Sequence, residues 1–293
     1  MPEKDEPSGA SLVPAASQTW AAMADKALTV AAASPDMREA GASLARSTRT
    51  IAQTIEVCLK PLTAVHYAYV KGRAYFEEKF QPRLEERTKD IPASSVQDPP
   101  PAVAAQVLQN LAFAHDEPSL EDMYLELLAT SMDGRLAKDS AHPAFVEVVR
   151  QLTALEATLL RDVFLKVDRL SVVELRKNFN AVNSAEFGSH ERMARYVFNL
   201  RSTDSPQAEI DGLGAMVDNW IRLGLATVSF ETKFISPNAY AWVENRPETT
   251  RARAGCSSAD ETIQIMPGVF EPTEFGQRFA LAVGIRPKKT VIA

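Results

Sequence analysis

The segment after the triple proline at 99–101 constrains the fold most, because it carries the most regular apolar pattern of the chain. Apolar side chains recur at three- and four-residue steps, first over 103–111 and then over 120–131. This period predicts two amphipathic helices that pack as a hairpin, each burying one apolar stripe. The polar run 115–119 between them supplies a stop signal and places Pro118 in the first turn of the second helix.

Two more helices are predicted directly after this hairpin. Asp133-Gly134 ends the second stripe, and Pro143 fits the first position of a short helix that reaches about residue 152. Thr153 and Glu156 form a capping box that opens a further helix. The residues expected to face inwards on that helix are Leu155, Leu159, Leu160, Val163, Phe164 and Val167. Together these helices make a central helical core over 99–168.

The chain before this core is predicted as a helical region that begins after a disordered tail. Residues 1–17 are the tail, because they are rich in Ala, Ser and Pro and show little periodicity. A long helix is expected from 62 to about 89, where interleaved charges favour a solvated face with i,i+4 pairs. The proline-rich stretch 91–101 reads as a linker, so 18–98 forms the N-terminal helical region and linker.

The last third, 169–293, is predicted as a winged-helix-like α+β module. One helix is expected to start at the capping box Ser171–Glu174, and two more are expected over 189–200 and 208–223. The expected strands cover 226–230, 234–236 and 262–266. A polar insert occupies 244–260, and a closing helix is expected from Thr273. Three helices, a hairpin and a final helix match the element order of a winged helix. The predicted fold class is therefore mainly α, with N-terminal helical hairpins and a bundle followed by this module.

The composition is that of an ordinary soluble globular protein. The chain has 293 residues, is 45% hydrophobic and carries a formal net charge of −6. Cys58 and Cys256 stand far apart in no ligand or redox spacing, which fits a reducing cytoplasm. No secretory signal is recognised near the start, and no apolar stretch reaches the roughly 20 residues that a transmembrane helix needs. We therefore expect a cytoplasmic protein without a transmembrane segment.

An acidic cluster at the start of the second core helix is the strongest candidate for chemistry. It comprises Asp116, Glu117, Glu121, Asp122 and Glu126, flanked by His115 and His142. Carboxylates four residues apart share a helix face and could hold a hard cation. Acids also gather in first helical turns because the dipole favours them there, and no recognised ligand spacing accompanies these. Capping and surface charge are the preferred interpretation, and no metal or cofactor is predicted.

Catalysis is not predicted. His142 precedes Pro143 without a nucleophile motif or an acid partner at defined spacing, so helix capping is the preferred role. No glycine-rich phosphate motif occurs, and no small-molecule substrate is evident.

DNA binding is disfavoured but stays an alternative. The expected recognition helix 208–223 carries Glu209, Asp211 and Asp218 against one arginine, and phosphate contacts need basic residues. The basic residues Arg246, Arg251 and Arg253 are candidates for a wing contact, although acids lie beside them.

Two runs of sequence carry a resemblance to a known family. AHDEPSLEDMYLELLATSMD (114–133) and HPAFVEVVRQLTALEATLL (142–160) resemble the core helices of the Abi-alpha, or abortive infection alpha, family of bacterial phage-defence proteins. Weaker similarity extends the resemblance over most of 55–284. Leu125-Glu126, Ala144 and the long insert between Phe230 and Phe270 depart from the family pattern.

The resemblance implies a cytoplasmic bacterial protein linked to abortive infection, and it transfers no catalytic residue. The candidate interaction or family-signature positions are Asp116, Glu117, Glu121, Tyr124, Leu127, Leu128, Met132, His142, Pro143 and Phe145. We predict a non-enzymatic sensor or effector of phage defence that acts by binding a protein partner or by self-association. The alternatives are a DNA-binding winged-helix regulator and a peripheral membrane-acting effector that uses the helices before residue 90.

Overall fold

The computed structural model describes residues 51–59 except 52 and 56, and 66–287 except 167, 180–189, 201–208, 237 and 259–260. The chain divides into two compact units. The helical unit comprises 1–157 together with 281–293, and the sheet unit comprises 158–280. The predicted tail at 1–17 lies outside the described residues.

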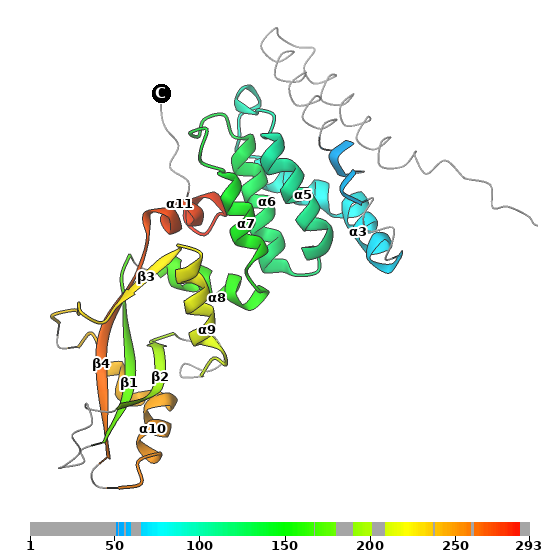
Figure 1. Ribbon diagram of the computed structural model, residues 1–293. Coiled ribbons are helices and arrows are strands. Elements are labelled where there is room, and N and C mark those ends of the chain that lie inside the picture. Colours follow the sequence, from blue (N-terminus) through cyan, green and yellow to red (C-terminus); the bar gives the residue numbers. More distant parts are fainter. Residues whose placement is uncertain are drawn as a thin grey trace, which may run out of the picture. The chain divides into compact units, whose positions relative to one another are not determined.

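The helical unit is built from helices that surround the predicted hairpin (Figure 1). Its elements are α3 (His66–Glu78), α4 (Phe80–Thr88), a short 3₁₀ turn (Ala93–Ser95), α5 (Pro101–Ala114), α6 (Pro118–Met132) and α7 (Pro143–Arg150). Helices α5 and α6 pack on each other and both contact α7. Both predicted apolar stripes are buried, for example through Leu108, Leu111 and Leu127. The predicted hairpin is therefore confirmed.

The helix predicted from 62 to about 89 is helical over its described residues, but it is interrupted at Lys79 and forms α3 and α4. Three buried rings flank this break: Tyr75 and Phe76 lie edge to face at 5.3 Å between ring centroids, and Phe76 lies 5.2 Å from Phe80. The Lys79 amide still donates to the Tyr75 carbonyl at 2.9 Å, so the interruption is confined to one residue. Residues 62–65 lie outside the described residues.

Helix α8 (Ala154–Lys166) begins at the predicted capping box. The Thr153 amide donates to Glu156 Oε2 at 2.8 Å, and the Glu156 amide donates to Thr153 Oγ1 at 3.2 Å. This reciprocal pair satisfies two free amides of the first turn. The prediction that Leu155 faces inwards is wrong, since it is 48% exposed. It lies in the first turn at the edge of a stripe that is centred on Leu160.

The sheet unit contains an antiparallel sheet in the order β2-β1-β4-β3 (Figure 1). Its elements are β1 (Leu170–Phe179), β2 (His190–Phe198), α9 (Leu213–Arg222), β3 (Ala226–Ser229), a 3₁₀ turn (Ala241–Asn245), α10 (Pro247–Ala254), β4 (Glu261–Pro272) and α11 (Glu274–Ala282). Val173 and Leu175 pack with Val243 and Ala252 in one buried cluster. A second core brings Trp220 of α9 within 6.4 Å of the Phe270 ring on β4.

Several predictions for this region are wrong. The helices expected from Ser171 and over 189–200 are the strands β1 and β2. The β-branched Val172 and Val173 pair with β2 on one side and β4 on the other, and this long-range pairing overrides the local capping pattern. The helix expected over 208–223 begins only at Leu213.

The remaining predictions give a mixed result. The strands expected near 226 and 262 and the closing helix near Thr273 are confirmed. Residues 234–236 form no strand, and the insert 244–260 contains α10. The coarse fold class, mainly α with a smaller amount of β, is confirmed. The winged-helix arrangement is not confirmed, because two of its three expected helices are strands. In the part of the chain that the structure describes, no helix has the length and apolarity to cross a bilayer.

Candidate functional site

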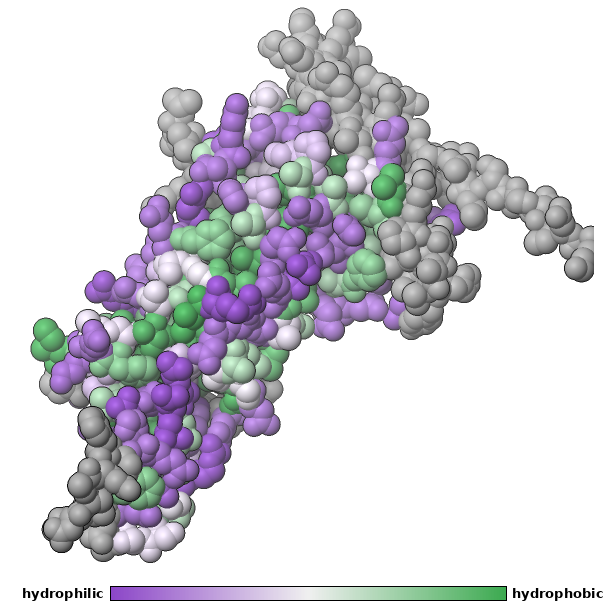
Figure 2. Space-filling model, in the orientation of Figure 1, coloured by the Kyte–Doolittle hydropathy of each residue, from purple (hydrophilic) through white to green (hydrophobic). Residues whose placement is uncertain are grey.

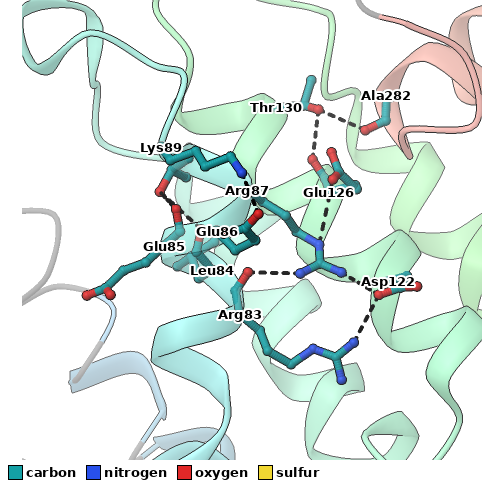
Figure 3. Close-up of polar contacts among 11 residues, drawn as sticks. Arg83, Leu84, Glu85, Glu86, Arg87, Lys89, Asp122, Glu126, Thr130 and Ala282 are labelled. Atoms are coloured by element: carbon teal, nitrogen blue, oxygen red, sulfur yellow. Dashed lines mark hydrogen bonds and ion pairs between the residues drawn. The ribbon is translucent and has the colours of Figure 1, made fainter.

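Three acids of the predicted cluster meet two arginines of α4, and Figure 3 shows Asp122 and Glu126 beside Arg83 and Arg87. Arg83 Nη1 donates to Glu121 Oε2 at 2.6 Å, and its Nη2 donates to Asp122 Oδ1 at 3.2 Å. Arg87 donates to the same Asp122 oxygen, and its Nε lies 3.6 Å from Glu126 Oε1. Three carboxylates of α6 therefore pair with two arginines of α4, which ties these two helices together.

Glu121 is the most enclosed member of this network, with only 2% of its side chain exposed. Its Oε1 accepts a hydrogen bond from the Tyr75 hydroxyl at 2.8 Å. Burial and this hydrogen bond to Glu121 raise the pKa of Tyr75 above its ordinary range. The interpretation of Glu121 as surface or capping charge is wrong, because its partners come from α3 and α4. Among the described residues, no group of three or more His, Cys, Asp or Glu side chains is placed to hold a metal ion.

The first two predicted acids lie at the exposed start of α6. Asp116 Oδ2 accepts from Lys71 Nζ of α3 at 2.8 Å, and this hydrogen bond lowers the pKa of the Asp116 carboxyl. Glu117 is exposed at the N-cap position but makes no side-chain capping hydrogen bond. His115 packs against Tyr75, with 5.2 Å between the ring centroids. Asp116 and Glu117 are therefore exposed, whereas the His115 side chain is only 10% exposed.

The other predicted site positions have structural roles in the helical unit. The buried members of this group are Tyr124, Leu127, Leu128, Met132 and Phe145. His142 is the N-cap of α7, and its Nδ1 accepts from the Ala144 amide at 3.1 Å, with Pro143 in the first turn. The preferred capping role of His142 is confirmed. The use of any of these positions by a partner stays a prediction.

The segment 282–287 lies beside the C-terminal part of α6, next to this network. The Thr130 hydroxyl lies within hydrogen-bond distance of the carbonyl oxygens of Glu126 (2.7 Å) and Ala282 (2.8 Å) (Figure 3). A hollow of about 540 Å³ lies here, lined mainly by charged side chains and by 284–287. Asp133 and Arg135 line it and bind each other in a fork, with distances of 2.7 and 2.8 Å. Sequence reasoning missed this hollow because it depends on the return of the chain to α6.

A second charged cluster, the Glu174 arginine cluster, lies in the sheet unit and was not predicted. The Glu174 carboxylate on β1 is 2% exposed and receives the Nε atoms of Arg176 at 2.5 Å, Arg192 at 3.1 Å and Arg195 at 3.6 Å. Arg195 Nη1 also lies 3.6 Å from Asp218 of α9. The sequence signal was the polar side chain at every second position, Glu174, Arg176 and Asn178, which has the period of a strand.

Tyr196 beside this cluster has an unusual backbone conformation. Its φ is 56°, a left-handed value that a bulky residue rarely adopts. Its hydroxyl donates to Asp218 Oδ1 at 2.9 Å, and the Arg195 guanidinium lies 4.4 Å above its ring. Burial, supported by the hydrogen bond to Asp218, raises the pKa of Tyr196 to about 12. The hydroxyl therefore stays protonated at neutral pH and acts as a hydrogen-bond donor.

The arginines proposed for a DNA-contacting wing are all matched by carboxylates. Arg246 is buried and binds Glu248 through Nε at 3.0 Å and Nη2 at 2.8 Å. Arg251 pairs with Glu209, and Arg253 pairs with Glu244. The Arg251 guanidinium lowers the pKa of Glu209, which keeps that carboxylate ionised beside it. These contacts leave little net positive charge for a phosphate backbone at the predicted wing.

The family assignment rests on a match that spans most of the described residues. Residues 72–283 match the model of the family described as abortive infection alpha. The chain belongs to the abortive infection alpha family. The match runs from within α3 to the residue after α11, so it includes both the Glu121 network and the Glu174 arginine cluster. Comparison with curated proteins and with solved structures found no match. The predicted membership of the abortive infection alpha family is thus confirmed.

Proposed function

We propose that this member of the abortive infection alpha family acts in phage defence by binding a protein partner or a second copy of itself, without catalysing a reaction. The observation that carries the proposal is the family match over 72–283. In abortive infection, an infected cell stops growing or dies before the phage completes its cycle. The chain would then be a sensor or effector of that response in the cytoplasm of a bacterial cell.

The polar side chains in the two segments that resemble the family, 114–133 and 142–160, support a binding role and not a catalytic one. A general acid or base must lie within hydrogen-bond reach of its substrate. Glu121 is enclosed and bound by Tyr75 and Arg83, while the His142 Nδ1 accepts a backbone amide. These groups are used to hold the helices together, which leaves partner binding to other parts of the surface.

Exposed apolar side chains on neighbouring helices supply a surface for such a partner. Val57, Val70 and Phe113 are all at least half exposed, and Phe113 is 61% exposed. Val57 lies on the segment 51–59, Val70 on α3 and Phe113 on α5. Both other segments contact α5: α3 packs on it, and the Cys58 Sγ lies 3.7 Å from the Ala105 carbonyl oxygen of α5. Over much of the face drawn in Figure 2, apolar residues are interspersed with hydrophilic ones. Aromatic side chains at protein interfaces often dominate the binding energy, so Phe113 is the first residue to change.

We expect Phe113→Asp to abolish binding at this surface, whether to a partner or to a second copy of the chain, because a carboxylate would be buried unpaired at the contact. Protection against phage should be lost with it. The unfolding midpoint should stay close to that of the wild type, since the side chain is mostly exposed. Leu155→Asp, at another exposed apolar position, is the matched control and should keep both properties. Light scattering and affinity capture from infected cells measure association. Unchanged association and protection in Phe113→Asp would argue against this surface.

The two alternatives have less support. A membrane-facing role for the helices before residue 90 would need free basic side chains, but Arg83 and Arg87 are engaged with α6. A DNA-binding role with α9 as the recognition helix would rest on Arg222 as the basic residue of that helix, and phosphate contacts need several. Protein–protein contact is therefore the function we propose for the helical unit.

A further inference from the structure

The Glu174 arginine cluster has more positive than negative charge. Three guanidinium groups meet the single carboxylate of Glu174, and Asp218 adds a second carboxylate near Arg195. The wing arginines Arg246, Arg251 and Arg253, in contrast, each have a carboxylate of their own. The cluster therefore holds a surplus positive charge that another anion can neutralise.

The sheet register makes this surplus costly without a ligand. Arg176 on β1 lies directly opposite Arg192 on β2 in the antiparallel pairing. Like charges in this arrangement repel each other, so the pair lowers the stability of the sheet. Glu174 offsets part of that cost through its contacts with the Nε atoms of these arginines. Among the described residues, the Nη groups of Arg176 and Arg192 have no hydrogen-bond partner.

A bulge in β2 brings the third arginine to the same carboxylate. Side chains three residues apart on a regular strand point to opposite faces, yet Arg192 and Arg195 both reach Glu174 Oε2. The pairing shifts register on both sides of Leu175, and Tyr196 takes the left-handed conformation at this place. Bulges often re-aim a side chain beside a functional site. Here the irregular backbone collects three arginines around one buried anchor.

We propose that this cluster binds the phosphodiester backbone of a nucleic acid. Guanidinium groups held by Nε present their Nη donors in a fork that fits two phosphate oxygens. The buried Glu174 fixes the arginines before binding, which reduces the entropy lost on contact. The sheet unit therefore supplies a polyanion site in addition to the partner surface proposed for the helical unit.

The openness of the face favours a long polyanion over a small phosphate compound. Small-ligand sites enclose most of the ligand, whereas the Arg192 side chain is 51% exposed. Polar groups continue along β1 and onto the neighbouring β4, where Asn178 Nδ2 donates to Gln264 Oε1 at 3.1 Å. An extended chain of phosphates can contact an open face at several points, and each contact adds to the affinity.

Fluorescence anisotropy of the full chain with a labelled oligonucleotide, single-stranded and as a duplex, tests the site at about 50 mM salt. We expect at least one form to bind and Arg192→Gln to weaken that binding about tenfold, since a hydrogen bond to a charged group is lost. The slope of log affinity against log salt should also fall by roughly 0.7 to 0.9. Arg251→Gln changes the net charge equally and should bind like the wild type, because Glu209 already occupies Arg251.

Three results would overturn the assignment. They are the absence of binding to both forms, equal weakening by Arg192→Gln and Arg251→Gln, and binding of pyrophosphate as tightly as the oligonucleotide. Thermal unfolding checks that Arg192→Gln is folded. If Arg192→Gln is not folded, Arg192→Lys takes its place, because lysine keeps the charge but lacks the two-donor fork of the guanidinium group. It should weaken binding by a smaller factor, and unchanged binding would count against the site. The outcome is independent of phage protection, which tests the function proposed above.

Discussion

Gly276→Ala is expected to lower the free energy of unfolding by about 3 kcal/mol or more, through overpacking against a backbone that cannot move away. A Cβ atom at this position of α11 would lie 1.9 Å from the Leu225 carbonyl oxygen and 2.8 Å from its carbon. The start of α11 is bonded to the same stretch: the Thr273 amide donates to the Leu225 oxygen at 3.0 Å, and the Thr273 hydroxyl lies 2.5 Å from the Gly224 oxygen. Relieving the clash would break these contacts.

Gly214→Ala is the matched control for this prediction. Gly214 lies in α9, and a Cβ atom there would meet nothing within 4 Å. Alanine in an open helical position should raise stability by up to about 1 kcal/mol. Denaturant unfolding of both variants, followed by circular dichroism, gives the comparison. A cost below about 1 kcal/mol for Gly276→Ala would contradict the close approach of α11 to Leu225.

Glu121→Ala is expected to cost about 3 kcal/mol of stability, because it removes one partner from a buried ionic contact. The Tyr75 hydroxyl would lose its acceptor in the interior, and Arg83 would lose its shortest ion pair. Water can partly replace the second contact, since the Arg83 side chain is 39% exposed. The loss should therefore fall at the low end of the range for buried pairs, and Glu121→Gln, which keeps the shape, should cost less.

Glu117→Ala provides the control on the same helix. Glu117 is exposed and makes no capping hydrogen bond, so its replacement should change stability by less than about 0.5 kcal/mol. Unfolding curves for these variants separate an internal role of the acidic segment from a surface role. Equal effects of Glu117→Ala and Glu121→Ala would show that the enclosed network does not stabilise the helical unit.

The parts of the fold that follow from local pattern were predicted from the sequence. The hairpin of α5 and α6 was predicted because its apolar residues keep the helical period through both stripes. The His142 cap and the Thr153 capping box were predicted because each is a contact within three residues. Strand β1 was missed because its identity depends on β2 and β4, and β4 pairs with it from about 90 residues further along the chain.

Both charged clusters show why the candidate sites were harder to predict. The acids of α6 were found from the sequence, but their partners Arg83 and Arg87 are 38 and 35 residues away from Glu121 and Asp122. Their charges were therefore interpreted as solvated. The Glu174 arginine cluster needs a strand register and a bulge, neither of which has a local signature here. Periodicity gives the elements, while the pairing of distant elements decides which charges meet.

The most direct test of the proposed function is the fate of single infected cells that express the full chain. At low phage multiplicity, we expect the culture to survive and the phage yield per infected cell to fall relative to cells without the protein. At high multiplicity, the same culture should stop growing or lyse before phage release, because nearly every cell is infected. A normal phage yield per infected cell, or continued growth of the infected cells themselves, would contradict an abortive-infection role.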